Sequence, residues 1–274
     1  MQPKSLISLA FAALIVTASS VFAADREASR AFLEVTGFDV AIRSMQQDAM
    51  SGPGIAGTAP DAFGAQWVEL ARDVFDPDEM VERSLDMMEA ILPDDLLAHG
   101  ATFYASDLGQ RLVAAENESQ GLSSAERFSA GEVIVEGLRE NNPKRLEEYD
   151  LMMKAIGGVD SSVNALIEIQ VRYLMAAMAA GGEDIDLSEA ELREVLQQQA
   201  GQLRESMAKY SILGAAYVYR DFSDADVVAY RKALEAEDMQ QVYEILNGIQ
   251  FQVMSERYEA MAGQLGALKP QQDI

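Results

Sequence analysis

Cysteine is absent from the sequence, and histidine occurs only once, as His99. Without cysteine, the chain has no disulfide framework and no lipid anchor attached through a thiol. A single imidazole excludes a metal site that uses two or more histidines, and no thiolate is available to complete one. A Ser-His-Asp triad would depend on His99, which we interpret instead as a core or surface residue. We therefore predict neither a metal nor another cofactor.

Basic residues are scarce. The chain has 21 Lys and Arg against 45 Asp and Glu, and its formal net charge is −24. Such a surface repels nucleic acid and anionic membranes, so neither is predicted as a partner. Solubility is the simplest interpretation of this charge, and attraction of cations or of a basic partner is the alternative. The 49% of hydrophobic residues is ordinary for a globular chain.

Long apolar runs are also rare, and the one at the N-terminus resembles a signal peptide. Lys4 precedes the apolar residues 6–16, and Val21 to Ala23 form a small-x-small-like cleavage site. The run is too short for a comfortable span of roughly 20 residues. We predict that residues 1–23 are removed, that the mature chain has no integral membrane segment, and that it is periplasmic or secreted.

Alternating strand patterns are hard to find, whereas helical periodicity occurs in almost every window. Phe63, Trp67, Leu70 and Val74, for example, fall on one helical face. The sequence predicts an all-α multi-helix bundle. Helix ends are predicted from the capping-box pairs Ser123 with Glu126 and Ser188 with Glu191, from Asp76-Pro77 and Asn142-Pro143, and from Gly157-Gly158.

The two halves of the chain are similar. Residues 95–110 align without a gap with residues 226–241, so that Asp107 lies opposite Asp238. This alignment predicts two related helical repeats, residues 24–145 and a degenerate second copy at 146–263, followed by a flexible tail at 264–274. Chance similarity between amphipathic helices is the alternative. The first predicted repeat contains the Gly- and Pro-rich segment 51–60, which the second lacks. The alignment offset between the two halves changes by ten residues, about the length of this segment.

One short motif stands out in the first half: Phe103, Tyr104, Ser106, Gly109 and Leu112, in the pattern F-Y-x-S-x-x-G-x-x-L. This motif resembles the signature of a family of small exported helical domains known only as a domain of unknown function. The resemblance extends over about residues 75–137, and it implies export and a helical fold but no activity, substrate or catalytic residue. The second half departs from the pattern, with Leu234-Glu235, Glu237 and Gln240 at the corresponding positions.

In physical terms the motif predicts a corner between two helices. The first helix is expected to end near Ala105, and Ser106 to cap the second. Gly109 lets a neighbouring backbone approach, and Leu112 returns to the core. Packing therefore explains the whole motif, and a ligand site at Tyr104 or Ser106 is the alternative.

Residues 163–180 form the most apolar helical segment of the chain outside the signal peptide. Glu168 and Arg172 lie four residues apart in the favourable order, so we expect them to pair. The segment is predicted to be a central core helix or an interface between proteins. The candidate interface residues are Val163, Leu166, Val171, Leu174, Met175 and Met178.

These observations favour a non-enzymatic protein-interaction or structural module of the periplasm, which binds an unknown protein partner or itself. Binding of a small apolar or lipid-like ligand between helices is a second hypothesis, motivated by the many methionines. A carboxylate-based enzyme is a third, and it would use acid pairs such as Asp94-Asp95 or Glu147-Glu148. The segment from Glu183 to Ser188 does not fit a calcium loop of the EF-hand type.

Overall fold

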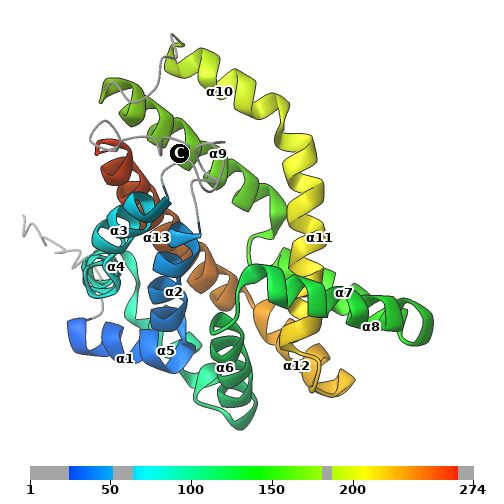
Figure 1. The fold of residues 1–274 in the computed structure, drawn as a ribbon. Coiled ribbons are helices and arrows are strands. Elements are labelled where there is room, and N and C mark those ends of the chain that lie inside the picture. The colour runs from blue at the N-terminus through cyan, green and yellow to red at the C-terminus, as the bar shows by residue number, and fades with distance from the viewer. Residues whose placement is uncertain (1–24, 52–63, 181–186, 265–274) are drawn as a thin grey trace, which may run out of the picture.

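The computed structural model describes residues 25–51, 64–180 and 187–264, and every regular element in these ranges is a helix (Figure 1). The predicted all-α multi-helix bundle is confirmed. The predicted signal peptide, almost all of segment 51–60 and most of the predicted tail lie outside the described residues. The helices are α1 (Arg26–Thr36), α2 (Phe38–Met50), α3 (Gly64–Val74), α4 (Pro77–Ile91), α5 (Asp94–Tyr104), α6 (Asp107–Gln120), α7 (Ser124–Asn141), α8 (Pro143–Ala155), α9 (Gly158–Ala179), α10 (Glu189–Gln198), α11 (Ala200–Val218), α12 (Asp224–Leu234) and α13 (Glu237–Ala262).

The long helix α13 crosses the centre of the molecule (Figure 1). It packs against α3, α4 and α5 from the first half of the chain and against α9 and α12 from the second. Met239, Leu246 and Val253 are buried along its length, because apolar residues recur at helical spacing. The two predicted repeats therefore contribute to one main core. Their predicted boundary, between residues 145 and 146, falls inside α8.

Large side chains fill the main core. Trp67, Tyr149 and Phe75 are almost completely buried, and the indole nitrogen Nε1 of Trp67 donates a 2.8 Å hydrogen bond to the carbonyl of Ala49. This bond satisfies the only polar atom of the buried indole, which would otherwise cost about 1 to 3 kcal/mol. A Gly at position 131 lets α7 approach α11 so closely that an added Cβ would lie 2.1 Å from the Leu213 carbonyl oxygen.

Arg145 on α8 is the most buried charged residue of the described chain. Its guanidinium donates to the Tyr149 hydroxyl at 2.8 Å, to Asp224 at 2.7 Å, and to the carbonyls of Tyr219 and Phe222 at 2.6 and 2.7 Å. The two carbonyls belong to the connection between α11 and α12. A buried cation whose donors are satisfied in this way fixes that connection against α8.

Helix ends follow the predicted caps in most cases. The capping boxes at Ser123 and Ser188 are both present, and Gly157 and Gly158 have φ angles of +111° and +67° before α9. Asp76 caps α4 by accepting from two backbone N–H groups. Asn142 occupies the N-cap position of α8 but makes no side-chain capping bond, and its amide nitrogen donates to Asp224 at 2.9 Å.

Helices α9, α10 and α11 form an arch above the rest of the bundle (Figure 1). A small second core lies inside this arch, made by Val163, Ile167 and Val171 of α9 with Leu192 of α10. One side of α9 packs against α10 and another packs against α13. This apolar helix is therefore covered on both sides by its own chain.

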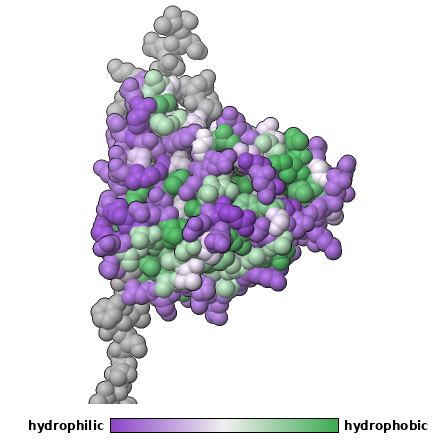
Figure 2. All heavy atoms as spheres, turned by 90° about the horizontal axis from the view of Figure 1, so that it is seen from below, coloured by the Kyte–Doolittle hydropathy of each residue, from purple (hydrophilic) through white to green (hydrophobic). Residues whose placement is uncertain are grey.

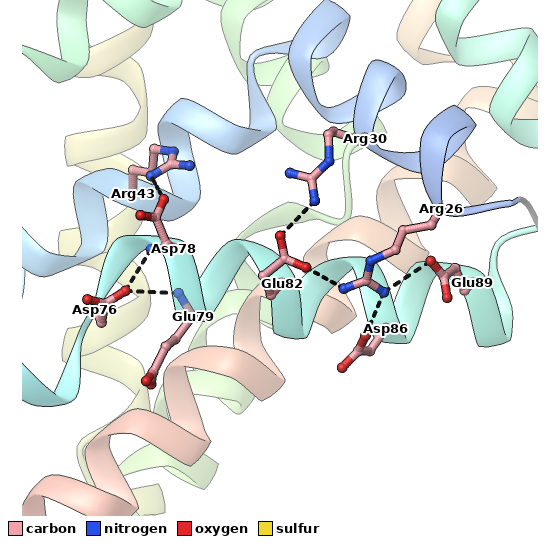
Figure 3. Close-up of polar contacts among 9 residues, drawn as sticks. All are labelled: Arg26, Arg30, Arg43, Asp76, Asp78, Glu79, Glu82, Asp86 and Glu89. Atoms are coloured by element: carbon pink, nitrogen blue, oxygen red, sulfur yellow. Dashed lines mark hydrogen bonds and ion pairs between the residues drawn. The ribbon is translucent and has the colours of Figure 1, made fainter.

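The N-terminal helices are attached to α4 by ion pairs (Figure 3). Arg26 contacts Glu82, Asp86 and Glu89, which follow one another along the face of α4 turned toward α1. Arg30 also pairs with Glu82, at 2.6 Å. These side chains are partly exposed, so water and salt screen each pair, and their main effect is to neutralise the acidic face of α4.

Within the described ranges, none of the helices is both long enough and apolar enough to cross a membrane.

Candidate functional site

The most unusual chemistry of the described chain is a group of five polar side chains in the main core, where α5, α6, α12 and α13 meet the end of α11. We call it the Glu116–tyrosine cluster. All four tyrosine side chains are buried, and Glu116 is half-buried. Its members are Tyr104, Glu116, Tyr219, Tyr230 and Tyr243.

Hydrogen bonds connect all five members. Tyr219 and Tyr230 donate to the same carboxylate oxygen of Glu116, Oε1, at 2.7 and 3.2 Å. The hydroxyl of Tyr230 also lies 3.1 Å from that of Tyr104 and 3.2 Å from that of Tyr243. Tyr104 and Tyr243 bond to each other through their hydroxyls.

When Glu116 is ionised, proton counting restricts the direction of the hydrogen bonds that lead to it. Each phenol has one O–H to donate and can accept from another group. Because Tyr230 donates to Glu116, it accepts from Tyr104 or Tyr243, and the remaining phenol donates to its neighbour. Every phenol proton of this group then has an acceptor, and the bonds all lead toward the carboxylate. Such a chain is polarised in one direction, which strengthens its members.

Burial raises the pKa of Glu116 to about 7, although the hydrogen bonds from Tyr219 and Tyr230 act in the opposite direction. Removal from water disfavours the charged carboxylate, and no arginine or lysine is among the groups that offset this effect. Burial likewise raises the pKa of each of the four tyrosines above 10. Glu116 therefore exchanges a proton in the neutral range, whereas the phenols stay protonated.

The F-Y-x-S-x-x-G-x-x-L motif positions one end of this cluster. Tyr104 is the last residue of α5, and Ser106 caps α6 by accepting from the Gly109 N–H at 3.1 Å. A Cβ at Gly109 would lie 2.5 Å from the Cα of Tyr104, so only glycine lets α6 approach the end of α5. Leu112 is buried one turn later. The structure thus has the helix-to-helix corner that the sequence predicts.

Phe103 connects the cluster to the surface. Its ring stacks on that of Tyr230, with centroids 5.8 Å apart and planes inclined by 5°, and it meets Tyr104 edge to face. Phe103 also lines a shallow groove of about 610 Å³ between α5, the end of α12 and the start of α13. We call this the α5–α12 groove. Its lining residues are Asp95, Ala98, His99, Thr102, Phe103, Ala233, Ala236, Asp238 and Met239.

The α5–α12 groove is lined mainly by apolar atoms, with small alanine side chains along its walls. Figure 2, seen from the side on which α5, α6 and α12 lie, shows hydrophobic residues gathered across part of this face among hydrophilic ones. His99 lies at the rim, where its Nδ1 is 3.7 Å from Asp238. The lone histidine is thus part of the groove and does not contact the Glu116–tyrosine cluster through any hydrogen bond found in the described residues.

The predicted interface on α9 is largely used within the chain. Val163 and Val171 are buried in the second core, and Leu174 and Met175 pack against it. Leu166 and Met178, like Leu174 and Met175, are half-buried, so these four candidate interface residues retain some exposed surface. The predicted Glu168–Arg172 pair is present at 3.2 Å, and Arg193 of α10 joins it at 2.6 Å.

The acid pairs considered for catalysis have structural roles. Asp94 and Asp95 stand at the start of α5, where negative charge is favourable. Glu148 forms a 2.7 Å ion pair with Arg231. Across the described part of the chain, no three acidic or histidine side chains are grouped so as to hold a metal ion.

Sequence reasoning found Tyr104 but missed the rest of the Glu116–tyrosine cluster. A signal was available: Glu116 follows the buried Leu112 and Val113 by four and three residues, which places it on the inner face of α6. Tyr230 follows the buried Val227 by three residues, and Tyr243 follows the buried Met239 by four. An acid on an apolar helical stripe is the pattern to look for.

Comparison with known proteins gives no further guidance, because no family model, curated protein or solved structure matches the chain.

Proposed function

We propose that this chain is a non-enzymatic helical binding module of the bacterial envelope, in which an apolar segment of a protein partner occupies the α5–α12 groove. The observation that carries the proposal is the groove itself, with its volume of about 610 Å³ and its mainly apolar lining. Concave apolar surfaces between helices are where amphipathic partner helices dock. The partner that supplies this segment is either another protein or a second copy of this chain.

The floor of the groove is held rigidly, which favours binding. Met239 is completely buried, and Phe103 is fixed by its stacking on Tyr230. Tyr230 is itself held by hydrogen bonds to Glu116, Tyr104 and Tyr243. A pre-formed surface loses little conformational entropy when a partner binds. In this proposal the buried polar cluster supports the binding surface and performs no chemistry.

Export is part of the proposal. The pattern of Lys4, the apolar residues 6–16 and Ala23 supports removal of a signal peptide. Asp25 caps α1 by accepting from the Ala28 N–H at 2.9 Å. A mature chain that begins at Ala24 keeps this cap, so cleavage leaves the described fold intact. The corner at residues 103–112 supports kinship with the exported helical family of unknown function.

A carboxylate-based enzyme is a second candidate, supported by the pKa of Glu116 near 7, which suits general acid–base work. Two observations weigh against it. The carboxyl bonds to phenols and not to a second carboxylate. In addition, the lining of the α5–α12 groove contains no member of the Glu116–tyrosine cluster, so a substrate there would not reach Glu116.

The proposal can be tested by native mass spectrometry of the mature protein purified from a periplasm without denaturation. Ala98 is exposed in the groove, and Ala98→Trp fills the space without disturbing the core. The expected result is a protein complex, or a defined oligomer, that Ala98→Trp disrupts. The control is Val133→Trp on α7, at a side chain that is 72% exposed. A persistent non-protein mass, or a complex that both variants retain, would contradict the proposal and in the first case favour the lipid-like ligand.

A further inference from the structure

We infer that the partner segment is a cationic amphipathic helix, an inference that rests on the proposed function of the α5–α12 groove. Its apolar face lies on Phe103 and the alanines, and its lysines or arginines meet carboxylates at the rim.

The charged residues in the lining are both acidic. Asp95 and Asp238 stand at the rim, and both are exposed. Asp94 and Glu237, their neighbours in sequence, are exposed as well and add two further negative charges, against one positive charge from the exposed Lys232 beside Ala233. The imidazole of His99, which lies near Asp238, is the one basic side chain in the lining. An apolar floor with a negative rim is complementary to a helix that carries positive charges beside its apolar face.

Several acidic faces elsewhere in the described fold are matched by arginines from neighbouring helices. The carboxylates of α4 face Arg26, Arg30 and Arg43 of α1 and α2 (Figure 3). Asp226 pairs with Arg111, and Glu256 pairs with Arg83.

The groove rim differs from these matched faces, and it shares its unpaired carboxylates with other exposed positions of the described chain, such as Glu136 and Glu140 of α7. Among the described residues, Asp94, Asp95 and Glu237 take part in no ion pair within 4.0 Å, and the nearby Arg231 is engaged by Glu148 and Glu235. Because these carboxylates lie at the starts of helices, the helix dipole stabilises part of their negative charge. It does not supply a counter-charge, and a cationic partner does.

The length of the groove sets the length of the segment. The part of α5 that lines the groove runs from Asp95 to Phe103, which corresponds to about 12 Å at 1.5 Å per residue. A partner helix of two to three turns fits along it. The net charge of the chain, −24, attracts such a cationic segment over a long range and repels an anionic one.

Two designed helical peptides of about three turns serve as probes. Both carry the same leucine face, flanked in one by lysines and in the other by glutamates, and fluorescence anisotropy reports their binding to the mature chain. We expect the lysine peptide to bind at least about tenfold more tightly than the glutamate peptide. Asp95→Asn with Asp238→Asn is expected to weaken it by roughly fivefold. The matched control is Glu136→Gln with Glu140→Gln, which removes two exposed charges from α7.

The outcomes separate this inference from the proposed function. Equal binding of the two peptides, or equal weakening by the two pairs of substitutions, overturns the charge inference. The groove still stands in that case if Ala98→Trp abolishes binding. If the lysine peptide does not bind, or if Ala98→Trp leaves its binding unchanged, then the groove is not the docking site and both proposals fail.

Discussion

Tyr219 donates a 2.7 Å hydrogen bond to the carboxylate of Glu116, although 103 residues separate the two in the sequence. The bond ties the end of α11 to the inner face of α6, and so joins the two halves of the chain through a titratable group. Glu116 is half-buried and has no counter-cation in the cluster, which makes its protonation state sensitive to pH in the neutral range. The stability of the fold should respond to this group.

The first prediction concerns the pH dependence of stability. The pKa of Glu116 rises from an ordinary value of 4.5 to about 7 on folding, so the folded state binds more protons than the unfolded state between these values. The free energy of unfolding should therefore fall as pH rises from about 4.5 to 7. Glu116→Gln removes this dependence and is expected to stabilise the protein at pH 8 by about 1 to 3 kcal/mol. Urea unfolding at several pH values measures it.

The control for this variant lies on the same helix. Glu118 is exposed, and Glu118→Gln removes the same charge without touching the tyrosines. It should leave the slope between pH 4.5 and 7 unchanged. An identical pH profile for Glu116→Gln and the wild type would show that the carboxyl is not held away from water.

At lower pH the sign reverses. The pKa of Asp226 is lowered from 3.8 to about 2, chiefly because Arg111 and Ser223 donate hydrogen bonds to its carboxylate. A depressed folded pKa gives stability that is present above 3.8 and is lost as pH falls toward 2. Taken by themselves, these two groups stabilise the fold most between about pH 3.8 and 4.5. Asp226→Asn should flatten the acid limb only.

The hydrogen bond from Tyr219 gives a second prediction. Its donation to the carboxylate lowers the pKa of Glu116, so Tyr219→Phe should raise that pKa above 7. The fold should lose about 1 kcal/mol at neutral pH. Carbon-13 NMR of the Glu116 carboxyl measures the shift directly. Tyr210→Phe, at an exposed phenol on α11, is the matched control, and it should not move the titration. A downward shift in Tyr219→Phe would contradict the assigned geometry.

Glycine at the motif corner gives a third prediction. An added Cβ at Gly109 would lie 2.4 Å from the carbonyl oxygen of Phe103, so Gly109→Ala must separate α5 from α6. We expect a loss of about 2 kcal/mol or more, measured by thermal or urea unfolding. Gly137 on α7 has no atom within 4 Å of its added Cβ. Gly137→Ala should instead stabilise by about 0.5 to 1 kcal/mol, and a similar loss in both variants would contradict the close approach.

The sequence predicts most of the local structure because its signals are local. The corner at Ser106 and Gly109 is found from residues next to one another, and so is the pairing of Glu168 with Arg172. A third capping box, between Ser223 and Asp226, was not predicted because aspartate replaces the usual glutamate.

Long-range contacts could not be predicted in the same way. The cluster forms only when α6 meets α12 and α13, more than 100 residues away, and no local pattern encodes that contact. Likewise, α9 looked like an interface because nothing in its own sequence shows that α10 covers Val171.

The structure bears on the predicted duplication in two ways. Helices α5 and α12 have the same length, and each is followed after two residues by a second helix. If the first residues of the two helices are aligned, Asp94 pairs with Asp224. The sequence alignment pairs Asp95 with Asp226, so the two alignments differ by one residue. The duplication stays a prediction.

The fourth prediction separates core from surface on α9. Val171 is 1% exposed in the second core, so Val171→Glu should destabilise the arch of α9, α10 and α11 by several kcal/mol, on the order of 3 or more. Leu166 is half-buried outside both cores, and Leu166→Glu should leave the unfolding free energy nearly unchanged. Urea unfolding with analytical ultracentrifugation measures stability and mass together. A lower mass in Leu166→Glu alone would support α9 as an interface.

Site-specific photo-crosslinking in the periplasm tests the central claim most directly. A photoreactive side chain is placed at Ala98 or Thr102 in the α5–α12 groove, and at Val133 on α7 as the control. The account predicts one shared protein product from the two groove positions, none from Val133, and loss of the Thr102 product when Ala98→Trp is added. The same products from all three positions, or none from the groove, would contradict it.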